Sequence, residues 1–249
     1  MTDRTLATRV AAENLDWIVP DWPAPDNVHA LSTTRNDGPT CEIDFATRSP
    51  DIAQARRKLR RFVPHEPVWL SQVHGTAIAS ADATPSSTPQ ADGAVAHIAG
   101  SVCAVLTGDC LPVLYASRDG SVVAAAHAGW RGLAAGVLEA AVDAMRVEPE
   151  SVLAWLGPAI GPTAFEVGAD VYAAFNADDA ATGACFKRAR TGKWHADLYA
   201  LARHRLACAG VHAVYGGNRC TYTERDAFYS YRRGGADAAR RMATVIWRT

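Results

Sequence analysis

The sequence lacks long apolar runs and blocks of basic residues, and both absences narrow the classes of protein that it can encode. No run approaches the roughly 20 apolar residues that a helix needs to cross a bilayer. The first residues, MTDRTLATRVAAENLDW, include acidic side chains and lack the apolar stretch of a signal peptide. The formal net charge is -1 and no cluster of Lys or Arg dominates, so nucleic acids and membranes are not expected partners.

The cysteine pattern and two missing glycine motifs exclude further classes. The 6 cysteines form no CxxC pair and no dense framework, which indicates reduced thiols in a cytoplasmic protein. A GxxxxGK[ST] loop and a strand-linked GxGxxG are both absent, which disfavours nucleoside triphosphate and dinucleotide chemistry.

What is present is ordinary globular material. The 249 residues are 49% apolar and 20% charged, which is enough to bury a full core. No repeat occurs, and expected strands and helices follow one another without a regular βαβα alternation. We therefore expect a single compact α/β (mixed α+β) domain over residues 1–249. Its sheets should be mixed and flanked by helices, with residues 1–27 forming a peripheral N-terminal segment.

Hydrophobic spacing places the individual elements. Strands are expected at residues 28–34, 68–72, 76–80, 102–106, 112–116, 122–126, 152–156, 211–215 and 242–247. Helices are expected from the Ser49-Pro50 start signal onward and at residues 133–145, 169–175 and 196–209. The strands at 68–72 and 76–80 should form a hairpin whose turn carries His74.

Three metal-binding side chains lie at the expected strand ends: His74, Cys110 and His127. A single Cys or His is more often structural, but three of them at strand ends resemble the rim of an active site. Two imidazoles and a thiolate suit Zn²⁺ and leave a fourth position open for water or substrate. Their spacing matches no zinc-finger signature. Without metal, Cys110 could instead act as a nucleophile with a neighbouring His as its base.

Other polar residues of this region have two readings each. Asp109, next to Cys110, could accept a proton or orient a ligand, or it could be a polar turn residue. A helix starting near Arg131, after Gly129, would point free N–H groups at the His127 rim and could bind an anion together with the Arg131 side chain. The alternative is a tight strand-to-helix turn. Arg35 follows a strand and could meet an anionic or hydroxylated ligand, or remain a solvated loop residue.

Four motifs carry a resemblance to a known family. They are QVHG at 72–75, ADG at 91–93, TGDCLPVL at 107–114 and AAHAGWRG at 125–132. Together they resemble the multicopper polyphenol oxidase or laccase-domain family, whose members are also called purine nucleoside phosphorylases and peptidoglycan editing factors. Supporting motifs extend the resemblance over nearly the whole chain after about residue 28: STTR at 32–35, LGPAIGP at 156–162, FEVG at 165–168 and FYSYRR at 228–233.

The resemblance implies a fold related to cysteine-hydrolase-like toxins and a zinc site of His74, Cys110 and His127. It implies phosphorolysis of adenosine, inosine, guanosine and methylthioadenosine to the base and (methylthio)ribose-1-phosphate, together with deamination of adenosine. Purine nucleosides and phosphate would be the partners of a monomer or weak homo-oligomer. Arg35 and Asp109 fall in motifs that border the pocket. The sequence departs from the family at Gly108 and Ala159, where TADC and GPCIGP are more usual.

The names of this family imply two rival functions. One is a copper-dependent polyphenol oxidase, although 8 histidines without a His-x-His pair are few for multicopper chemistry. The other is the editing of cytoplasmic peptidoglycan precursors, with Cys110 and His127 as a hydrolase pair. In the favoured phosphorolysis, Arg131 and the helix start at Gly129 would hold phosphate beside an oxocarbenium-like sugar. In deamination, Asp109 would shuttle the proton.

Overall fold

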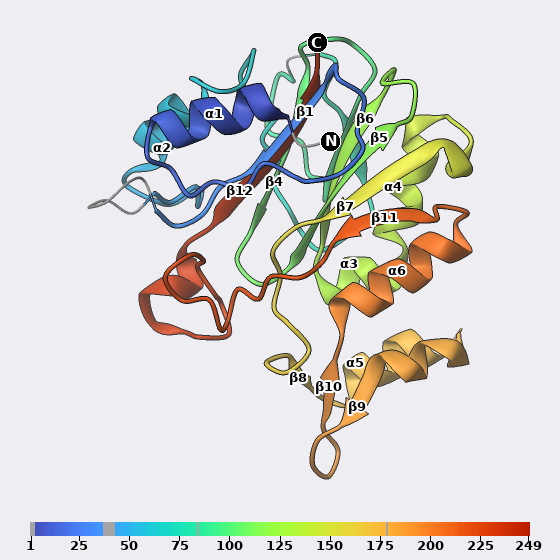
Figure 1. Ribbon diagram of the computed structural model, residues 1–249. Coiled ribbons are helices and arrows are strands. Elements are labelled where there is room, and N and C mark those ends of the chain that lie inside the picture. The colour runs from blue at the N-terminus through green and yellow to red at the C-terminus, as the bar shows by residue number, and fades with distance from the viewer. Residues whose placement is uncertain (1–2, 37–42, 84, 178) are drawn as a thin grey trace.

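Two β-sheets stacked face to face form the centre of the protein, and helices cover both outer faces (Figure 1). The computed structural model describes residues 3–36, 43–83, 85–177 and 179–249. It confirms the mixed α/β architecture expected from the sequence. Within the described ranges, no helix is both long and apolar enough to span a membrane. The five cysteines of these ranges are free thiols, and Cys41 lies outside the described residues.

The larger sheet has six strands in the order β11-β7-β5-β6-β3-β2. The strands span Ile78–Ser80 (β2), Gly93–Ala96 (β3), Leu111–Ser117 (β5), Val123–Ala128 (β6), Val152–Leu156 (β7) and Ala213–Gly216 (β11). Strands β5, β6 and β7 are buried along their whole length, since other layers cover both faces of the sheet. β5 and β6 pair antiparallel with Pro112 opposite His127, so the ends that carry Cys110 and His127 are neighbours.

The second sheet has three antiparallel strands in the order β1-β12-β4. These strands span Val28–Ser32 (β1), Val102–Thr107 (β4) and Met242–Arg248 (β12). Apolar side chains such as Val105 and Ile246 pack from this sheet against Leu114 and Val123 of the larger one. The C-terminal strand thus lies in the middle of its sheet and ties the end of the chain to the core.

Helices α1 (Arg4–Ala12) and α2 (Ile52–Leu59) cover the outer face of the smaller sheet (Figure 1). The sequence does not predict α1, which begins at Asp3, whose carboxylate accepts a hydrogen bond from the N–H of Leu6 at 3.0 Å. Leu6 is buried against the sheet. The N-terminal segment therefore lies on the outside of the molecule but also contributes to its core.

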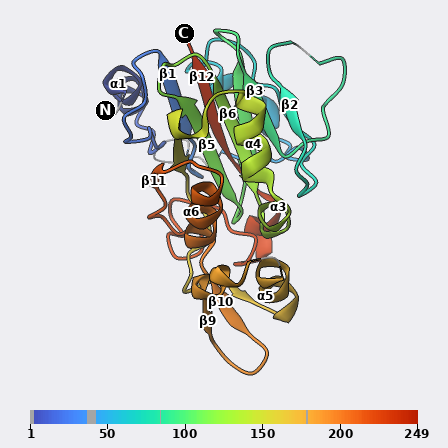
Figure 2. The same ribbon diagram turned by 90° about the vertical axis from the view of Figure 1, so that its right-hand side faces the viewer.

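Helices α3 (Trp130–Ala135), α4 (Val137–Met145) and α6 (Leu198–Cys208) cover the opposite face (Figure 2). The sequence predicts one continuous helix over residues 133–145. That prediction is wrong, because Gly136 adopts a left-handed conformation with φ of 100° and separates α3 from α4. Helix α6 follows its prediction, since the Asp197 carboxylate caps its start and Gly210 ends it with φ of 85°.

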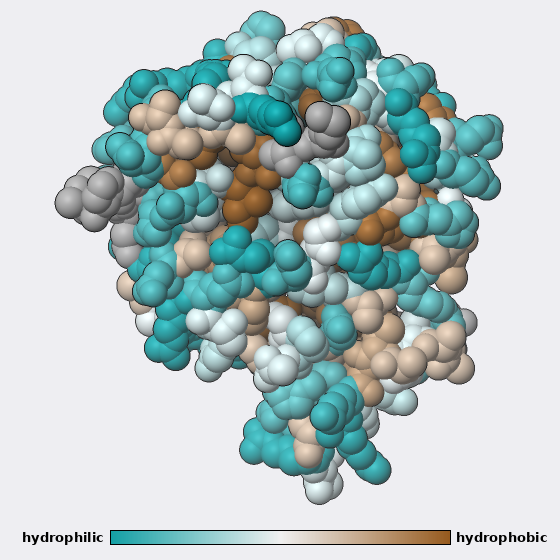
Figure 3. Space-filling view, in the orientation of Figure 1, coloured by the Kyte–Doolittle hydropathy of each residue, from teal (hydrophilic) through white to brown (hydrophobic). Residues whose placement is uncertain are grey.

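A small third sheet projects at the foot of the molecule in Figure 1. It consists of β8 (Glu166–Val167), β9 (Phe186–Arg188) and β10 (Trp194–Ala196) and packs beside α5 (Ala169–Asn176). Short 3-10 helices lie at Pro149–Ser151 (η1), Ala180–Cys185 (η2) and Gly235–Ala239 (η3). The tip of this lobe is hydrophilic in Figure 3. The sequence predicts α5 but not the three short strands.

The predicted hairpin of residues 68–72 and 76–80 is wrong. Val68 forms only an isolated bridge with Cys103, and β2 pairs in parallel with β3 instead. The Gln72 side chain takes the place of strand pairing, since its amide donates to the Leu106 carbonyl and accepts from the Leu106 N–H, each at 2.8 Å. The following bend carries His74, whose φ of 61° is incompatible with a strand.

Candidate metal centre and its pocket

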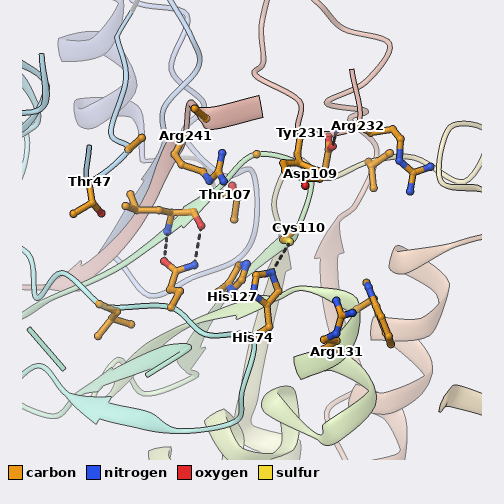
Figure 4. Close-up of a pocket in the computed structure, with 18 of the residues that line it drawn as sticks. Thr47, His74, Thr107, Asp109, Cys110, His127, Arg131, Tyr231, Arg232 and Arg241 are labelled. Carbon is orange, nitrogen blue, oxygen red and sulfur yellow. Dashed lines mark hydrogen bonds between the residues drawn. The ribbon is translucent and has the colours of Figure 1, made fainter. Parts of the chain in front are cut away.

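Three side chains from distant parts of the sequence converge at one end of the larger sheet (Figure 4). They are His74 from the bend before β2, Cys110 just before β5 and His127 in β6. The Cys110 Sγ lies 3.7 Å from the His74 Nε2, and the two imidazole ring centroids are 4.8 Å apart. One donor atom from each residue lies within 4.8 Å of the other two. The structure therefore brings together the three residues that the sequence identifies as possible metal ligands.

Asp92 holds two of these residues in place from behind. Its fully buried carboxylate accepts a hydrogen bond from the His127 Nδ1 at 2.8 Å. It also accepts from the backbone N–H groups of Val73, His74 and Gly75 at 3.1, 2.9 and 2.7 Å. One carboxylate thus fixes the His127 ring and shapes the bend that presents His74. A carboxylate behind a ligating histidine is typical of protein metal sites.

The backbone of Asp92 completes this arrangement. Asp92 comes directly before β3, which pairs antiparallel with β6, and its carbonyl accepts a hydrogen bond from the His127 N–H at 2.7 Å. The sequence alone assigns no role to Asp92, although this residue lies in the ADG motif at 91–93. An acidic residue directly before a short apolar strand is the signal that could have marked Asp92 as a buried, functional carboxylate.

The ionisation of the cluster prepares the Cys110 sulfur for metal binding, whereas His127 must lose a proton before its Nε2 can bind a metal ion. Burial raises the pKa of the Cys110 thiol, but the positive charge of His127 and the hydrogen bonds from both imidazoles outweigh it and lower the pKa to about 6. Burial lowers the pKa of His127, but the Cys110 thiolate and the Asp92 carboxylate outweigh it and raise the pKa to about 9. At neutral pH the sulfur is therefore a thiolate, which is the form that binds metal ions.

Two glycines make room for the cluster. A Cβ atom on Gly129 would lie 2.4 Å from the His74 Cδ2 and 3.1 Å from the Cys110 Sγ. A Cβ atom on Gly132 would lie 2.8 Å from the backbone oxygen of Gly75. Any side chain at Gly129 would therefore displace a ligand, which gives this residue a clear role beyond capping α3.

The donor set fits a zinc ion. One thiolate sulfur and two imidazole nitrogens are the ligands that Zn²⁺ prefers, and three protein ligands are typical of catalytic zinc sites with an open position. Because the Nδ1 of His127 faces Asp92, the Nε2 is its free donor atom. His127 is buried, whereas His74 is exposed, so the cluster is accessible from one side.

That accessible side is the wall of a cavity of about 710 Å³, which is large enough for a nucleoside-sized molecule. The cavity is bordered by the three candidate ligands and by aromatic and apolar side chains that include Trp130, Phe165 and Tyr231. Aromatic walls close to a polar, metal-binding rim suit a ligand with a flat base and a hydroxylated sugar.

Asp109 also lines this cavity, but both of its carboxylate oxygens are engaged. One accepts from the Thr221 hydroxyl at 2.6 Å, and the other accepts from the Ser230 hydroxyl at 3.0 Å and the Arg232 N–H at 2.6 Å. Asp109 thereby joins the segment beside Cys110 to the loop that carries Tyr231 and Arg232 (Figure 4). These hydrogen bonds indicate that Asp109 holds the wall of the cavity in place.

Arg131 and Arg48 are the cavity-lining arginines whose side chains are available to a ligand. Within the described ranges neither guanidinium makes a hydrogen bond or ion pair, and Arg131 lies over the Trp130 ring with its Cζ 4.2 Å from the centroid. By contrast, Arg232 donates to the Glu166 carbonyl at 2.9 Å, and Arg241 donates to the carbonyls of Ala238 and Arg240. Arg131 is expected from the sequence, whereas no sequence pattern points to Arg48.

Arg35 does not belong to the described residues that line the cavity. Its guanidinium lies over the Tyr229 ring with its Cζ 5.0 Å from the centroid and donates to the Arg225 carbonyl at 2.9 Å. Its Nη1 also lies 3.7 Å from Asp237. These contacts hold the loop after β1 against the segment at 225–237. Arg35 therefore supports the segment that carries the cavity residues Tyr231 and Arg232 but does not line the cavity itself.

A family model and individual relatives both match most of this chain. Residues 31–249 match the family model of the multi-copper polyphenol oxidoreductase laccases. The purine nucleoside phosphorylase YfiH of Escherichia coli is 48% identical over 241 residues, which cover 92% of this chain and 98% of that protein. The purine nucleoside phosphorylase PA4543 of Pseudomonas aeruginosa is 45% identical over 240 residues, with 93% and 98% covered.

A solved structure agrees with these sequence relatives. The crystal structure of the Neisseria meningitidis protein NMB0706 superimposes with a TM-score of 0.87 at 44% identity, covering 94% of this chain and 99% of that one. The similarity therefore extends over both stacked sheets and the small projecting lobe.

Proposed function

The chain belongs to the multi-copper polyphenol oxidoreductase laccase family, and we propose that it is a zinc-dependent purine nucleoside phosphorylase. The observation that carries this proposal is the cluster of His74, Cys110 and His127 at the edge of a cavity of about 710 Å³. The relatives named as purine nucleoside phosphorylases support the reaction class.

In this proposal His74, Cys110 and His127 hold the zinc ion, and Asp92 fixes the orientation of His127. Bound there, zinc would supply a Lewis-acidic positive charge facing the cavity. The walls of the cavity would orient the nucleoside and exclude bulk water. Trp130, Phe165 or Tyr231 would pack against the flat purine.

Phosphate would bind beside the sugar. In phosphorolysis the C1′–N9 bond breaks, an oxygen of phosphate bonds to C1′, and the purine leaves with the bonding electrons and takes up a proton. Because the sugar becomes positively charged in the transition state, an anion held next to C1′ lowers the barrier. Arg131 supports this placement, since within the described ranges its guanidinium makes no hydrogen bond or ion pair and it follows Gly129 at the start of α3.

The proposed substrates are adenosine, inosine, guanosine and methylthioadenosine, whose common part is a purine on a ribose. Deamination of adenosine to inosine and ammonia would take place in the same cavity, with water in place of phosphate. The three hydrogen bonds that Asp109 accepts favour a positioning role for this residue over the transfer of a proton.

A second candidate function has one observation in its favour. Without metal, the Cys110 thiolate and the protonated His127 form an ion pair of the kind that nucleophilic hydrolases use. Such a pair would fit the editing of peptidoglycan precursors, where an acyl bond is cleaved. It predicts activity that survives complete removal of metal, whereas the phosphorylase proposal predicts activity that is lost.

Product analysis tests the proposal. Protein of known metal content is incubated with adenosine, with and without phosphate, and the products are separated by chromatography. We expect adenine and ribose-1-phosphate only with phosphate, and inosine in both conditions. Absence of adenine from zinc-loaded protein under all conditions would reject the phosphorylase. Reloading with copper and assaying a phenol tests the oxidase, which predicts higher turnover on the phenol than on adenosine.

A further inference from the structure

A second group of metal-binding side chains lies outside the pocket, where α6 meets η2. It consists of Asp179, His204 and Cys208. His204 and Cys208 are one helical turn apart on α6, so their side chains project from the same face of the helix. Asp179 is the N-cap residue of η2. The group therefore bridges two elements that are distant in sequence.

The three donor atoms already converge. The His204 Nε2 is hydrogen-bonded to the Asp179 Oδ2 and lies 3.8 Å from the Cys208 Sγ. All three donor atoms lie within 4.8 Å of one another, as in the cluster of the pocket. The other oxygen of Asp179 accepts a hydrogen bond from the Ala181 N–H at 2.9 Å, which fixes the carboxylate with its Oδ2 toward His204. The backbone of η2 thus fixes the orientation of the Asp179 carboxylate in the metal-free protein.

The group is open to solvent. The side chains of His204 and Asp179 are 28% and 37% exposed, and Cys208 is exposed. A metal ion can therefore reach the three donor atoms without rearrangement of the core. A sulfur, an imidazole nitrogen and a carboxylate oxygen are all ligands that Zn²⁺ accepts, and three of them leave room for water.

We propose that Asp179, His204 and Cys208 form a second divalent-metal site of the zinc class, separate from the pocket. A metal ion there would link α6 to η2, which packs beside α5 and β9 of the projecting lobe. Since the unfolded chain does not hold these residues together, metal binding would stabilise the folded lobe. The site has a structural role and does not contribute to the chemistry of the pocket.

Cobalt titration of a variant without the first thiol tests this proposal. In Cys110→Ala protein, stripped of metal and titrated with Co²⁺, any thiolate-to-cobalt charge-transfer band must come from another cysteine. We expect this band to saturate at one equivalent with micromolar affinity and to disappear in Cys110→Ala/Cys208→Ala protein. Zn²⁺ should displace the cobalt and should raise the melting temperature of Cys110→Ala protein but not of the double variant.

Cys185 offers the matched control, because it lies in η2 near the group but is not one of its donors. Cys110→Ala/Cys185→Ser protein should keep the full band. The proposal is overturned if Cys110→Ala protein shows no thiolate band at micromolar cobalt, or if the band persists without Cys208. Neither result bears on the phosphorylase, which requires the first cluster only.

Discussion

The His127 Nδ1 lies 2.8 Å from the Asp92 Oδ1, and both side chains are almost fully shielded from solvent. This pair connects the metal cluster to the sheet, since Asp92 precedes β3 and His127 lies in the adjacent strand β6. Asp92 also connects His127 to His74, because the same carboxylate accepts a hydrogen bond from the backbone N–H of His74. The geometry of the cluster therefore depends on a residue that is not itself a candidate ligand.

Asp92→Asn should weaken metal binding about 10–100-fold, as is usual for the loss of a carboxylate behind a ligating histidine. One carboxylate oxygen becomes an N–H donor that faces other donors, so buried hydrogen-bonding groups lose their partners at a cost of about 1–3 kcal/mol each. Competition with a chromophoric zinc chelator measures the affinity, and chemical denaturation measures the free energy of unfolding.

Asp82→Asn provides the control for this substitution. Asp82 also accepts two backbone N–H bonds, from His97 and Ile98 at 2.9 Å each, and lies 3.4 Å from the His97 Nδ1, but it is remote from the cluster. This variant should keep the zinc affinity of the unmodified protein. Equal losses of affinity in both variants would mean that Asp92 has no special role in the metal site.

Gly129→Ala should disrupt the cluster while the fold is retained. The new methyl group would lie 2.4 Å from the His74 ring, and that ring cannot easily withdraw because Asp92 holds its backbone. We expect at least a tenfold loss of zinc affinity and of phosphorolysis. Gly108→Ala is the matched control, since its Cβ would lie at least 3.6 Å from the nearest atom. A zinc-binding, active Gly129→Ala protein would show that the steric argument is incorrect.

Metal-free protein should show an unusually reactive Cys110. The thiolate is the reactive form, so the rate of alkylation rises as pH rises through the pKa of the thiol. With a pKa of about 6, alkylation should be half-maximal near pH 6 instead of about pH 8.5 for an ordinary cysteine. Mass spectrometry of the Cys110 peptide follows the reaction.

The charge of His127 makes the largest contribution that lowers the pKa of Cys110, so His127→Gln should move the midpoint of Cys110 alkylation to higher pH. Bound zinc should protect the thiol in the unmodified protein. A midpoint near pH 8.5 in metal-free, unmodified protein would contradict the ion pair of Cys110 and His127.

Asp109 and Thr221 test whether the carboxylate positions a loop or moves a proton. If Asp109 positions the loop at 230–232, Thr221→Val should impair substrate binding in the same direction as Asp109→Asn. Thr221→Val removes the 2.6 Å hydrogen bond to Asp109, and Asp109→Asn replaces one of the two acceptor oxygens with an N–H donor. We expect both variants to raise the KM for adenosine about 3–10-fold, consistent with the loss of about one hydrogen bond, while zinc binding is kept. A large loss of kcat in deamination, confined to Asp109→Asn, would instead assign Asp109 to proton transfer.

The sequence predicts the parts of the fold that depend on local patterns. Strands such as β4, β5 and β7 are short apolar runs bounded by turn residues, and α6 carries its own start and stop signals in Asp197 and Gly210. The predicted hairpin at 68–80 fails because the backbone N–H groups of its turn donate hydrogen bonds to the carboxylate of Asp92, which is remote in sequence. Periodicity cannot reveal a contact of that kind.

The candidate site also contains residues that local sequence patterns predict and residues that only the three-dimensional arrangement reveals. His74, Cys110 and His127 stand out because all three are metal-binding side chains at expected strand ends, and their motifs resemble a known family. Asp92 and the steric role of Gly129 emerge only when β3, β6 and α3 are placed together in space. Arg35 lies beside Tyr229 and not on the cavity wall, since the direction of a loop side chain depends on long-range packing.

Stoichiometric reconstitution tests the central claim most directly. Cys208→Ala protein, which keeps the cluster in the pocket, is stripped of metal and titrated with zinc while phosphate-dependent release of adenine from adenosine is measured. The account predicts no release without metal, a linear rise and a plateau at one zinc per chain, with Cys110→Ala/Cys208→Ala protein inactive throughout. Full activity of the stripped protein, or an activity that does not depend on Cys110, would contradict it.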